Sequence, residues 1–460
     1  PRSVLKLVMF GFQHVLTMFP ATILVALLCG FHTSTVLLAA GLATIVALVL
    51  SRNGIGTYIP LFYGSSFSYI ASYFAVASGM GYKIVFGQPL PDDVIGVFQA
   101  GIIATAALNV LTGLVIMSIG KKRLDFFLPP VVTGSVACVI GLGLAKAALV
   151  DMAFGQAGAW WIALATLVVT LGCSHYLQGR GFIGQLPVLW GAVAGYLLAY
   201  FFAPQPIAFA GVVSAPWFSL PHLTWPVFSG PLVLTAIFSI SIMALATIPE
   251  STAHLYQISV YVDQLAEKKK HPKVKLEENI GFNLVCDGVG DAICGLCGGT
   301  AGTNYGENNS LMAVTRNYSG PALAAAAVIS IVLAFVGKFS AFLGTIPVYV
   351  SGGLAVYLFG VIGIQGIVLM NRSGVDFFDP LQLGIAAVVM VVGIGGNIGF
   401  QDGFLPIQIP GVFPRGLPAI ATAAFLAIVL NLLLRMRRPD GSTSAAQVPT
   451  GVQELRRSGQ

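Results

Sequence analysis

Two short polar stretches decide how this chain folds: Tyr63–Ser68, which reads YGSSFS, and Tyr305–Ser310, which reads YGENNS. Each stretch contains a glycine, interrupts an otherwise apolar segment and is too polar for a helix that faces lipid. Irregular backbone at membrane depth is tolerated only where protein buries it or where it lines a cavity. The two stretches therefore predict a polar site inside a membrane protein.

The composition around these stretches is that of a membrane protein. Of the 460 residues, 56% are hydrophobic and only 9% are charged, whereas soluble domains carry roughly 25% charged residues. Apolar runs of the length that a spanning helix needs, about 20 residues, recur from Val4 to Leu434. These runs do not alternate apolar and polar residues as the strands of a membrane barrel do. We predict an all-α polytopic membrane protein.

Apolar runs and helix breakers divide the chain into about fourteen segments. The first seven are predicted near residues 5–30, 32–50, 62–79, 95–118, 128–149, 157–174 and 183–202. The second seven are predicted near residues 231–256, 279–297, 305–315, 319–340, 345–369, 380–396 and 417–435.

Similar sequences recur between the two sets of segments. The polar stretches place the third segment opposite the tenth, and Pro130–Ser135 of the fifth segment is echoed by Pro347–Gly353 of the twelfth. These matches predict a repeat of seven plus seven segments, and an odd repeat unit inverts the second copy across the membrane. Paired interrupted segments in two repeats are the best sequence pointer to a transport site.

Lysine and arginine positions predict the orientation, because cytoplasmic loops are enriched in these residues. If both termini are cytoplasmic, all but four of the 23 basic residues lie in cytoplasmic loops or tails. The exceptions are Lys83, Lys146, Lys338 and Arg415. We therefore expect a multi-pass protein of the inner (plasma) membrane with both ends inside. The polar tail at 437–460 is expected to be disordered.

Two carboxylates lie inside apolar or broken segments rather than in loops: Glu250 and Glu307. A charge at mid-bilayer costs about 2.5–3.5 kcal/mol on insertion scales, so such residues mark a polar pathway or a proton-binding group. His254 lies four residues after Glu250 and hence on the same helical face. A Glu–His pair can hold and release a proton near neutral pH, so we interpret both acids as parts of a proton-coupled site.

A second acidic pair, Asp287 and Asp291, precedes a glycine-rich run at the end of the ninth segment. We interpret this pair as an exposed or helix-capping cytoplasmic end rather than as part of the site. Cys294 and Cys297 form a CxxC in the same run, where small residues favour close helix packing.

Other classes of function lack a sequence signal. Although the net charge is +6, the basic residues lie in short loops and form no face for a nucleic acid. The chain has no HExxH motif and no Walker-type phosphate loop, and the six histidines are scattered. We therefore expect no enzyme activity, metal or cofactor. An ion channel is the alternative from another class, and saturable, pH-dependent uptake would distinguish a transporter from it.

Four motifs of the chain resemble those of the nucleobase–ascorbate transporter family (nucleobase:cation symporter-2), most closely its bacterial uracil–proton symporters. They are the QH pair Gln13-His14, the GSSF stretch within Tyr63–Phe67, the ExxxH pattern of Glu250–His254, and Glu307–Arg316. The last reads ENNSLMAVTR and is similar to the family signature E/Q/P-N-x-G-x-x-x-x-T-R/K/G. It departs from that signature in one position, where Ser310 replaces the glycine.

The resemblance covers nearly the whole chain and implies two domains. A core domain would comprise residues 1–118 and 231–340, and a gate domain would comprise residues 119–204 and 341–436. Short β-like pieces of segments three and ten would meet near the midplane. The core would move against the gate in an elevator-like way, and the gate would form a homodimer.

The resemblance also implies a role for each site residue. Glu250 and Glu307 would accept hydrogen bonds from ring N–H groups, while backbone amides near Phe67 and Gly306 would donate to ring carbonyls. Phe67, Tyr305 and Phe359 would wall the ring, Ala21 would line its edge, and His254 would couple Glu250 to the proton. The motif residues expected to support this site are Gln13, His14, Asn308, Ser310 and Thr315.

Uracil or a related pyrimidine is the substrate that we expect, with xanthine or another purine as the alternative. Purine-transporting relatives more often carry glutamine at the position of Glu307, so the glutamate favours uracil, whereas Ser310 weakens this inference. The coupling ion is expected to be H⁺, and the sequence leaves Na⁺ open.

Overall fold

The computed structural model describes residues 2–120, 126, 128–156, 158–230, 232–410 and 412–436. Within these residues, eight helices are long and apolar enough to cross a membrane, and four shorter apolar helices accompany them. With the two broken segments they correspond to the fourteen predicted segments, so the polytopic helical fold is confirmed. The tail at 437–460 and the basic residues 121–123 lie outside the described part of the chain.

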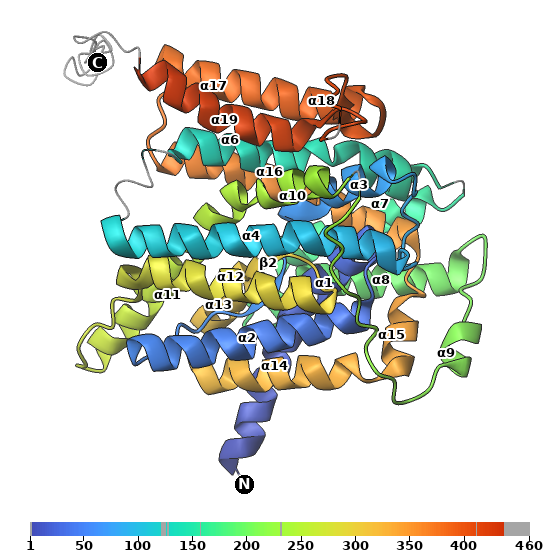
Figure 1. Ribbon diagram of the computed structural model, residues 1–460. Coiled ribbons are helices and arrows are strands. Elements are labelled where there is room, and N and C mark those ends of the chain that lie inside the picture. Colours follow the sequence, from blue (N-terminus) through green and yellow to red (C-terminus); the bar gives the residue numbers. More distant parts are fainter. Residues whose placement is uncertain are drawn as a thin grey trace, which may run out of the picture.

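Most of the long helices lie roughly parallel or antiparallel to one another, whereas α1 rises from the N-terminus at a steep angle to them (Figure 1). A first helix group joins helices from both halves of the chain: α12 packs against α4 and α2, and α14 packs against α1 and α2. Its helices are α1 (Arg2–Cys29), α2 (Thr33–Ile55), α3 (Ile70–Gly79), α4 (Asp92–Ile119), α10 (Val233–Ser241), α11 (Ala244–Lys268), α12 (Ile280–Cys297), α13 (Gly306–Thr315) and α14 (Gly320–Ala334).

A second helix group lies along one side of the first, with α16 packed against α6 and α7 (Figure 1). Gly134 and Gly141 of α6 face Gly366 and Gly363 of α16 with no room for a Cβ atom. Such small residues let membrane helices approach closely. The elements of this group are α6 (Pro130–Gly143), the π-helix η2 (Ala147–Phe154), α7 (Trp160–Tyr176), α8 (Pro187–Phe202), α16 (Val348–Arg372), α17 (Pro380–Met390), the π-helix η5 (Val391–Gly395), α18 (Gly396–Gly399) and α19 (Ala419–Met436).

Short elements connect the long helices. β3 (Phe404–Leu405) pairs with β4 (Leu417–Pro418) beside α18 and α19. The remaining short helices are η3 (Ile183–Gln185), α9 (Ala210–Ser214), η4 (Leu276–Asn279), α15 (Gly337–Leu343) and η6 (Gln401–Gly403).

The eighth predicted segment, 231–256, differs from the structure in two ways. It is divided between α10 and α11, and α11 continues to Lys268. The extension keeps an apolar face, since Ile258 is fully buried and Val262 packs against the same apolar cluster, while charged residues occupy the other face. Amphipathic residues therefore carry the helix beyond the end of the continuous apolar run.

Among the described residues, only one pair of strands joins the two halves of the chain: one strand lies in the first polar stretch, and the other lies directly before the second stretch and the predicted tenth segment. β1 (Tyr63–Ser65) pairs antiparallel with β2 (Gly302–Asn304), with Gly64 opposite Thr303. Each strand leads into a short helix: β1 into the 3₁₀ turn η1 (Phe67–Tyr69) and α3, and β2 into α13. The predicted meeting of β-like pieces is thus present.

Candidate functional site

Glycines make the close pairing of β1 with β2 possible. We call this pairing the β1–β2 crossing, or simply the crossing. A Cβ atom on Gly64 would lie 2.5–2.7 Å from the ring and hydroxyl of Tyr305, and one on Gly302 would collide with the Gly64 carbonyl. The Tyr305 hydroxyl is itself fixed, because it donates to the Ser65 carbonyl at 2.9 Å and lies 2.8 Å from the Thr22 hydroxyl. The crossing is therefore both tight and anchored by hydrogen bonds.

Helix N-termini from both halves meet at this crossing. Phe67 is the first residue of η1 and Gly306 the first residue of α13. The first turns of helices have N–H groups without partners inside the helix, and these carry partial positive charge. The crossing therefore offers backbone donors from two directions to an electronegative group.

The predicted acids lie close to each other beside these termini. Glu250 is half-buried in α11, and Glu307 occupies the exposed first turn of α13. Their carboxyl groups are within electrostatic range of each other. His254 also contacts this region, because a Cβ atom on Gly306 would lie 2.6 Å from its Nε2. The structure thus brings Glu250, Glu307 and His254 together.

His254 makes a different contact from the expected one. Its Nδ1 lies 2.9 Å from the carbonyl oxygen of Asn304 and 3.0 Å from the Asn304 side-chain oxygen. The described residues include no hydrogen bond between His254 and Glu250. The imidazole is therefore oriented by β2, and its Nε2 is directed toward the start of α13.

Asp287 corrects our interpretation of the second acidic pair. Its side chain is only 7% exposed, and it accepts hydrogen bonds from the Ser251 hydroxyl and, at 3.4 Å, from the Asn304 amide. Ser251 follows Glu250 directly and also accepts from Asn283 and Asn304 at 2.7 Å. A continuous polar network therefore connects the backbone beside Glu250 with α12 and β2.

Asp291 was likewise wrongly interpreted as an exposed or capping residue. It is completely buried and accepts three hydrogen bonds: from the Tyr63 hydroxyl at 2.5 Å, from the Asn109 amide at 2.8 Å and from the Gly302 backbone at 3.0 Å. Asp291 thus binds both strands of the crossing to α4 and α12.

The sequence held a signal for this burial. Gly288 and Gly290 lie between the two aspartates in the sequence. A Cβ atom on Gly288 would lie 2.7 Å from the Ala106 carbonyl, and one on Gly290 would lie 2.8 Å from the Tyr63 ring. Glycines at these spacings indicate that neighbouring segments press against α12 on the face of the aspartates.

Aromatic residues of both helix groups meet at the site. The Phe67 ring stands edge-on to the Phe359 ring of α16, with centroids 6.1 Å apart and planes at 75°. Phe67 is half-buried, whereas Tyr305, Phe359 and Ala21 are buried. Ala21 and Tyr305 belong to one apolar cluster that Phe67 also contacts. The four predicted lining residues therefore converge, with Phe359 supplied by the second helix group.

The predicted supporting residues take structural positions around α13. Asn308 is buried and its amide lies 3.0 Å from Nδ1 of His14, which joins α13 to α1. The Gln13 carbonyl accepts from Thr17, Ser310 donates to the Gly306 carbonyl, and Thr315 donates to the Leu311 carbonyl. Ser310 thus bonds within its own helix.

An open cavity of about 470 Å³ runs along α13. Ser310 and Val314 line it, and these residues lie on the same helical face as Glu307. Ser174 of α7 and Gln185 of η3 line the opposite wall. The cavity therefore separates α13 from the second helix group and extends along the face on which Glu307 is exposed.

Known proteins resemble this chain over nearly its whole length. The uracil permease of Bacillus caldolyticus is 35% identical over 432 residues, which cover 92% of this chain and 90% of that protein. The uracil permease of Bacillus subtilis is 30% identical and covers 96% and 95% of the two chains.

Solved transporter structures share the fold. The transmembrane domain of the cyanobacterial bicarbonate transporter BicA has a TM-score of 0.55 at 16% identity, with 93% of this chain and 96% of that chain covered. The structure of SLC26A9 has a TM-score of 0.63 at 13% identity, with 94% and 66% covered. At this identity the likeness concerns the fold, which has the same core and gate arrangement.

A match to a protein-family model identifies the family to which this chain belongs. The model of the Permease family matches residues 5–401, a span that contains the crossing strands, both glutamates and Phe359. The chain therefore belongs to this permease family, the nucleobase:cation symporter-2 family that its motifs resemble.

Proposed function

We propose that this permease takes up uracil, or a closely related pyrimidine, together with protons. Relatives that are 30–35% identical over more than nine-tenths of this chain are named uracil permeases. The observation that carries the proposal most directly is the β1–β2 crossing, which brings Glu307 and His254 of one half beside Phe67 of the other.

The site complements the polar edge of uracil. Uracil alternates N–H donors with carbonyl acceptors, and the site alternates carboxylate acceptors with backbone donors. Glu250 and Glu307 would accept from the ring N–H groups, and the first N–H groups of η1 and α13 would donate to the ring carbonyls. Hydrogen bonds to a charged group contribute about 1.5–3 kcal/mol, so two carboxylates provide strong discrimination against ligands without N–H groups.

The aromatic residues complement the faces of the ring. Phe67 and Phe359 are already in edge-to-face contact at 6.1 Å, and a planar ligand gains from stacked or edge-on aromatic neighbours. Because Phe359 belongs to the second helix group, a ring bound against Phe67 would also contact the gate.

Proton coupling rests on the acids and the histidine. A carboxylate in a low-dielectric site is costly unless it is paired or protonated. Glu250 has no basic partner among the described residues, while Glu307 and Asp287 lie within electrostatic range of it. A proton on Glu250 would relieve this repulsion. His254, held by Asn304 and directed at Gly306, lies between α11 and the first turn of α13, where it is placed to take part in the transfer of that proton.

Alternating access would come from movement of the first helix group against the second. In this proposal the first group is the core and the second is the gate, as the resemblance implies. The two groups contact each other in several places: α11 and η1 contact α6, α1 contacts α8, and α3 and α10 contact α19. The cavity along α13 would be one route to the site. The homodimer, the inner-membrane location, the cytoplasmic termini and the domain boundaries stay predictions.

Uptake by purified protein in lipid vesicles tests this proposal. Labelled uracil is supplied with and without an inward proton gradient, and unlabelled uracil, xanthine, hypoxanthine and guanine compete. We expect saturable uptake that the gradient stimulates and that uracil inhibits most strongly. Preferential inhibition by xanthine would instead support the purine alternative, and non-saturable flux would support a channel.

Variants that remove one carboxylate each test the roles of Glu250 and Glu307 in uptake. Glu250→Gln and Glu307→Gln are expected to lose gradient-driven uptake by about 100-fold or more, because each replaces a charged acceptor, whose hydrogen bond contributes up to about 3 kcal/mol, with a neutral amide that cannot carry a proton. Glu267→Gln is the matched control, since this exposed glutamate lies on α11 far from the crossing. Wild-type uptake in either site variant, at equal protein levels, would contradict the assignment.

A further inference from the structure

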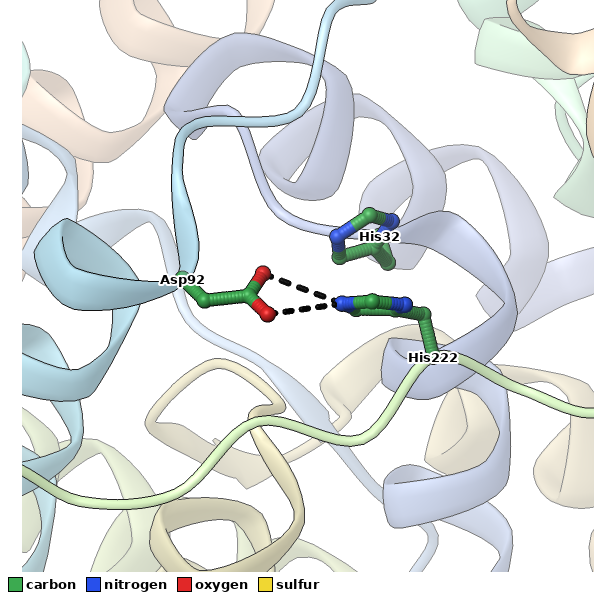
Figure 2. Close-up of side chains that lie close together, drawn as sticks. All are labelled: His32, Asp92 and His222. Carbon is green, nitrogen blue, oxygen red and sulfur yellow. Dashed lines mark hydrogen bonds and ion pairs between the residues drawn. The ribbon is translucent and has the colours of Figure 1, made fainter.

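Three residues that could ligate a metal converge at one end of the first helix group. His32 precedes α2, Asp92 is the first residue of α4, and His222 lies in the segment between α9 and α10. Figure 2 shows the Asp92 carboxylate directed at the His222 ring, with the His32 ring beside it. Nε2 of His222 lies 3.0 and 3.1 Å from the two carboxylate oxygens.

From this cluster we propose a binding site for a divalent transition metal of the zinc class. Two imidazoles and one carboxylate are a set that Zn²⁺ accepts, with water in the fourth position. One ligand atom from each residue lies within 4.8 Å of the other two. Around a tetrahedral ion with bonds of about 2.0–2.2 Å, ligand atoms are about 3.3–3.6 Å apart. Binding would therefore draw the three ligand atoms together by rotation of their side chains.

The backbone around the three ligands is already fixed. The Thr35 hydroxyl donates to the His222 carbonyl at 2.5 Å, which ties the connecting segment to α2. Two residues later, Thr224 and Gln99 exchange hydrogen bonds, including Gln99 Nε2 to the Thr224 carbonyl at 3.0 Å. An ion would therefore bind without ordering a loop, and binding avoids that entropic cost.

The ion pair between His222 and Asp92 does not by itself explain why His32 lies beside it. Exposed pairs of this kind contribute about 0–1 kcal/mol, and the contact with Asp92 involves only His222. The two imidazole rings have centroids 4.3 Å apart, a separation at which two protonated rings would repel each other. Two neutral rings, however, can direct nitrogen lone pairs at one cation.

The ring nitrogens of His32 are available to an ion. Within the described part of the chain, no hydrogen bond engages its ring nitrogens. His222 and Asp92 are 51% and 62% exposed, which gives a hydrated ion direct access.

Sequence spacing could not predict this site, because the ligands are contributed by three separate connections. A bound ion would tie the segment between α9 and α10 to α2 and α4. The inference does not depend on the transported substrate.

Metal titration of the purified full-length protein tests the site. The affinity tag is removed, bound metal is stripped with a chelator, and ZnCl₂ is added in a calorimeter. A parallel titration with Co²⁺ follows the visible absorption that a tetrahedral site produces. The variants are His32→Ala, His222→Ala and Asp92→Asn, and His271→Ala is the control because this exposed histidine lies in a different connection. Thermal unfolding in the presence of chelator verifies that each variant is folded.

One saturable equivalent of Zn²⁺ is expected for the wild type and the control, with affinity weakened about tenfold or more in each ligand variant. The Co²⁺ absorption should decline in the same variants. Equal affinity in the wild type, His32→Ala and His222→Ala would overturn the proposal. A wild-type dissociation constant above about 1 mM would overturn it as well.

Discussion

Replacement of Gly64 by alanine should push β1 and Tyr305 apart without removing any polar group from the site. The new methyl group would lie 2.5 Å from Cε2 and 2.6 Å from Cζ of Tyr305. Carbon atoms pack at about 3.5–4.0 Å, so the ring or the β1 backbone must move by about 1 Å.

The Tyr305 ring cannot move without cost. Its hydroxyl contacts Thr22 and Ser65 at 2.8 and 2.9 Å, and its backbone N–H donates to the Phe62 carbonyl at 2.9 Å. Overpacking costs about 1–3 kcal/mol, and each lost hydrogen bond adds about 0.5–1.5 kcal/mol. We expect Gly64→Ala to destabilise the protein by about 2–4 kcal/mol.

The functional loss should exceed the loss of stability. A displacement of about 1 Å at a reacting or binding group can cost about 100-fold, and Gly306 directly follows the displaced tyrosine. Uptake and thermal unfolding of the purified variant measure the two effects. Gly384→Ala serves as the matched control, because nothing lies within 4 Å of a Cβ atom there. Wild-type uptake and stability in Gly64→Ala would show that the close contact between Gly64 and Tyr305 does not hold the site together.

Three further substitutions probe the same crossing. Asp291→Asn places an amide hydrogen among three donors, so thermal unfolding should show a loss of about 1–3 kcal/mol; unchanged stability would contradict the network. Tyr305→Phe removes the contacts to Thr22 and Ser65 but keeps the ring, so stability should fall by about 1–2 kcal/mol while uracil affinity, measured by calorimetry, changes less. Ser310→Gly restores the family residue, and stability should fall by about 0.5–1 kcal/mol with uracil still preferred in competition; a switch to xanthine would show that this position selects the base.

The parts of the fold that depend on composition and local sequence could be predicted. Apolar runs located the fourteen segments, because the bilayer fixes their length and polarity. The polar stretches that contain Gly64 and Gly306 identified the two interrupted segments, and the family resemblance implied that their β-like pieces would meet. The motif residues then placed Glu250, Glu307 and His254 in one region.

Contacts between distant segments could not be derived in this way. Asp287 and Asp291 looked like a capping pair, because local sequence does not show that Tyr63, Asn109 and Ser251 supply their donors. The extension of α11 to Lys268 was missed because amphipathic turns resemble a loop when only continuous apolar runs are counted. The first error arises because tertiary contacts decide the burial of the aspartates, and the second because only continuous apolar runs were counted.

A structure of the purified protein with uracil bound tests the central claim most directly. We expect a planar ring between the Glu250 and Glu307 carboxyl groups, in contact with Phe67 and Phe359 and within hydrogen-bond distance of the first N–H groups of η1 and α13. Uracil bound away from both glutamates, for example only against Ser174 and Gln185 in the cavity, would contradict it.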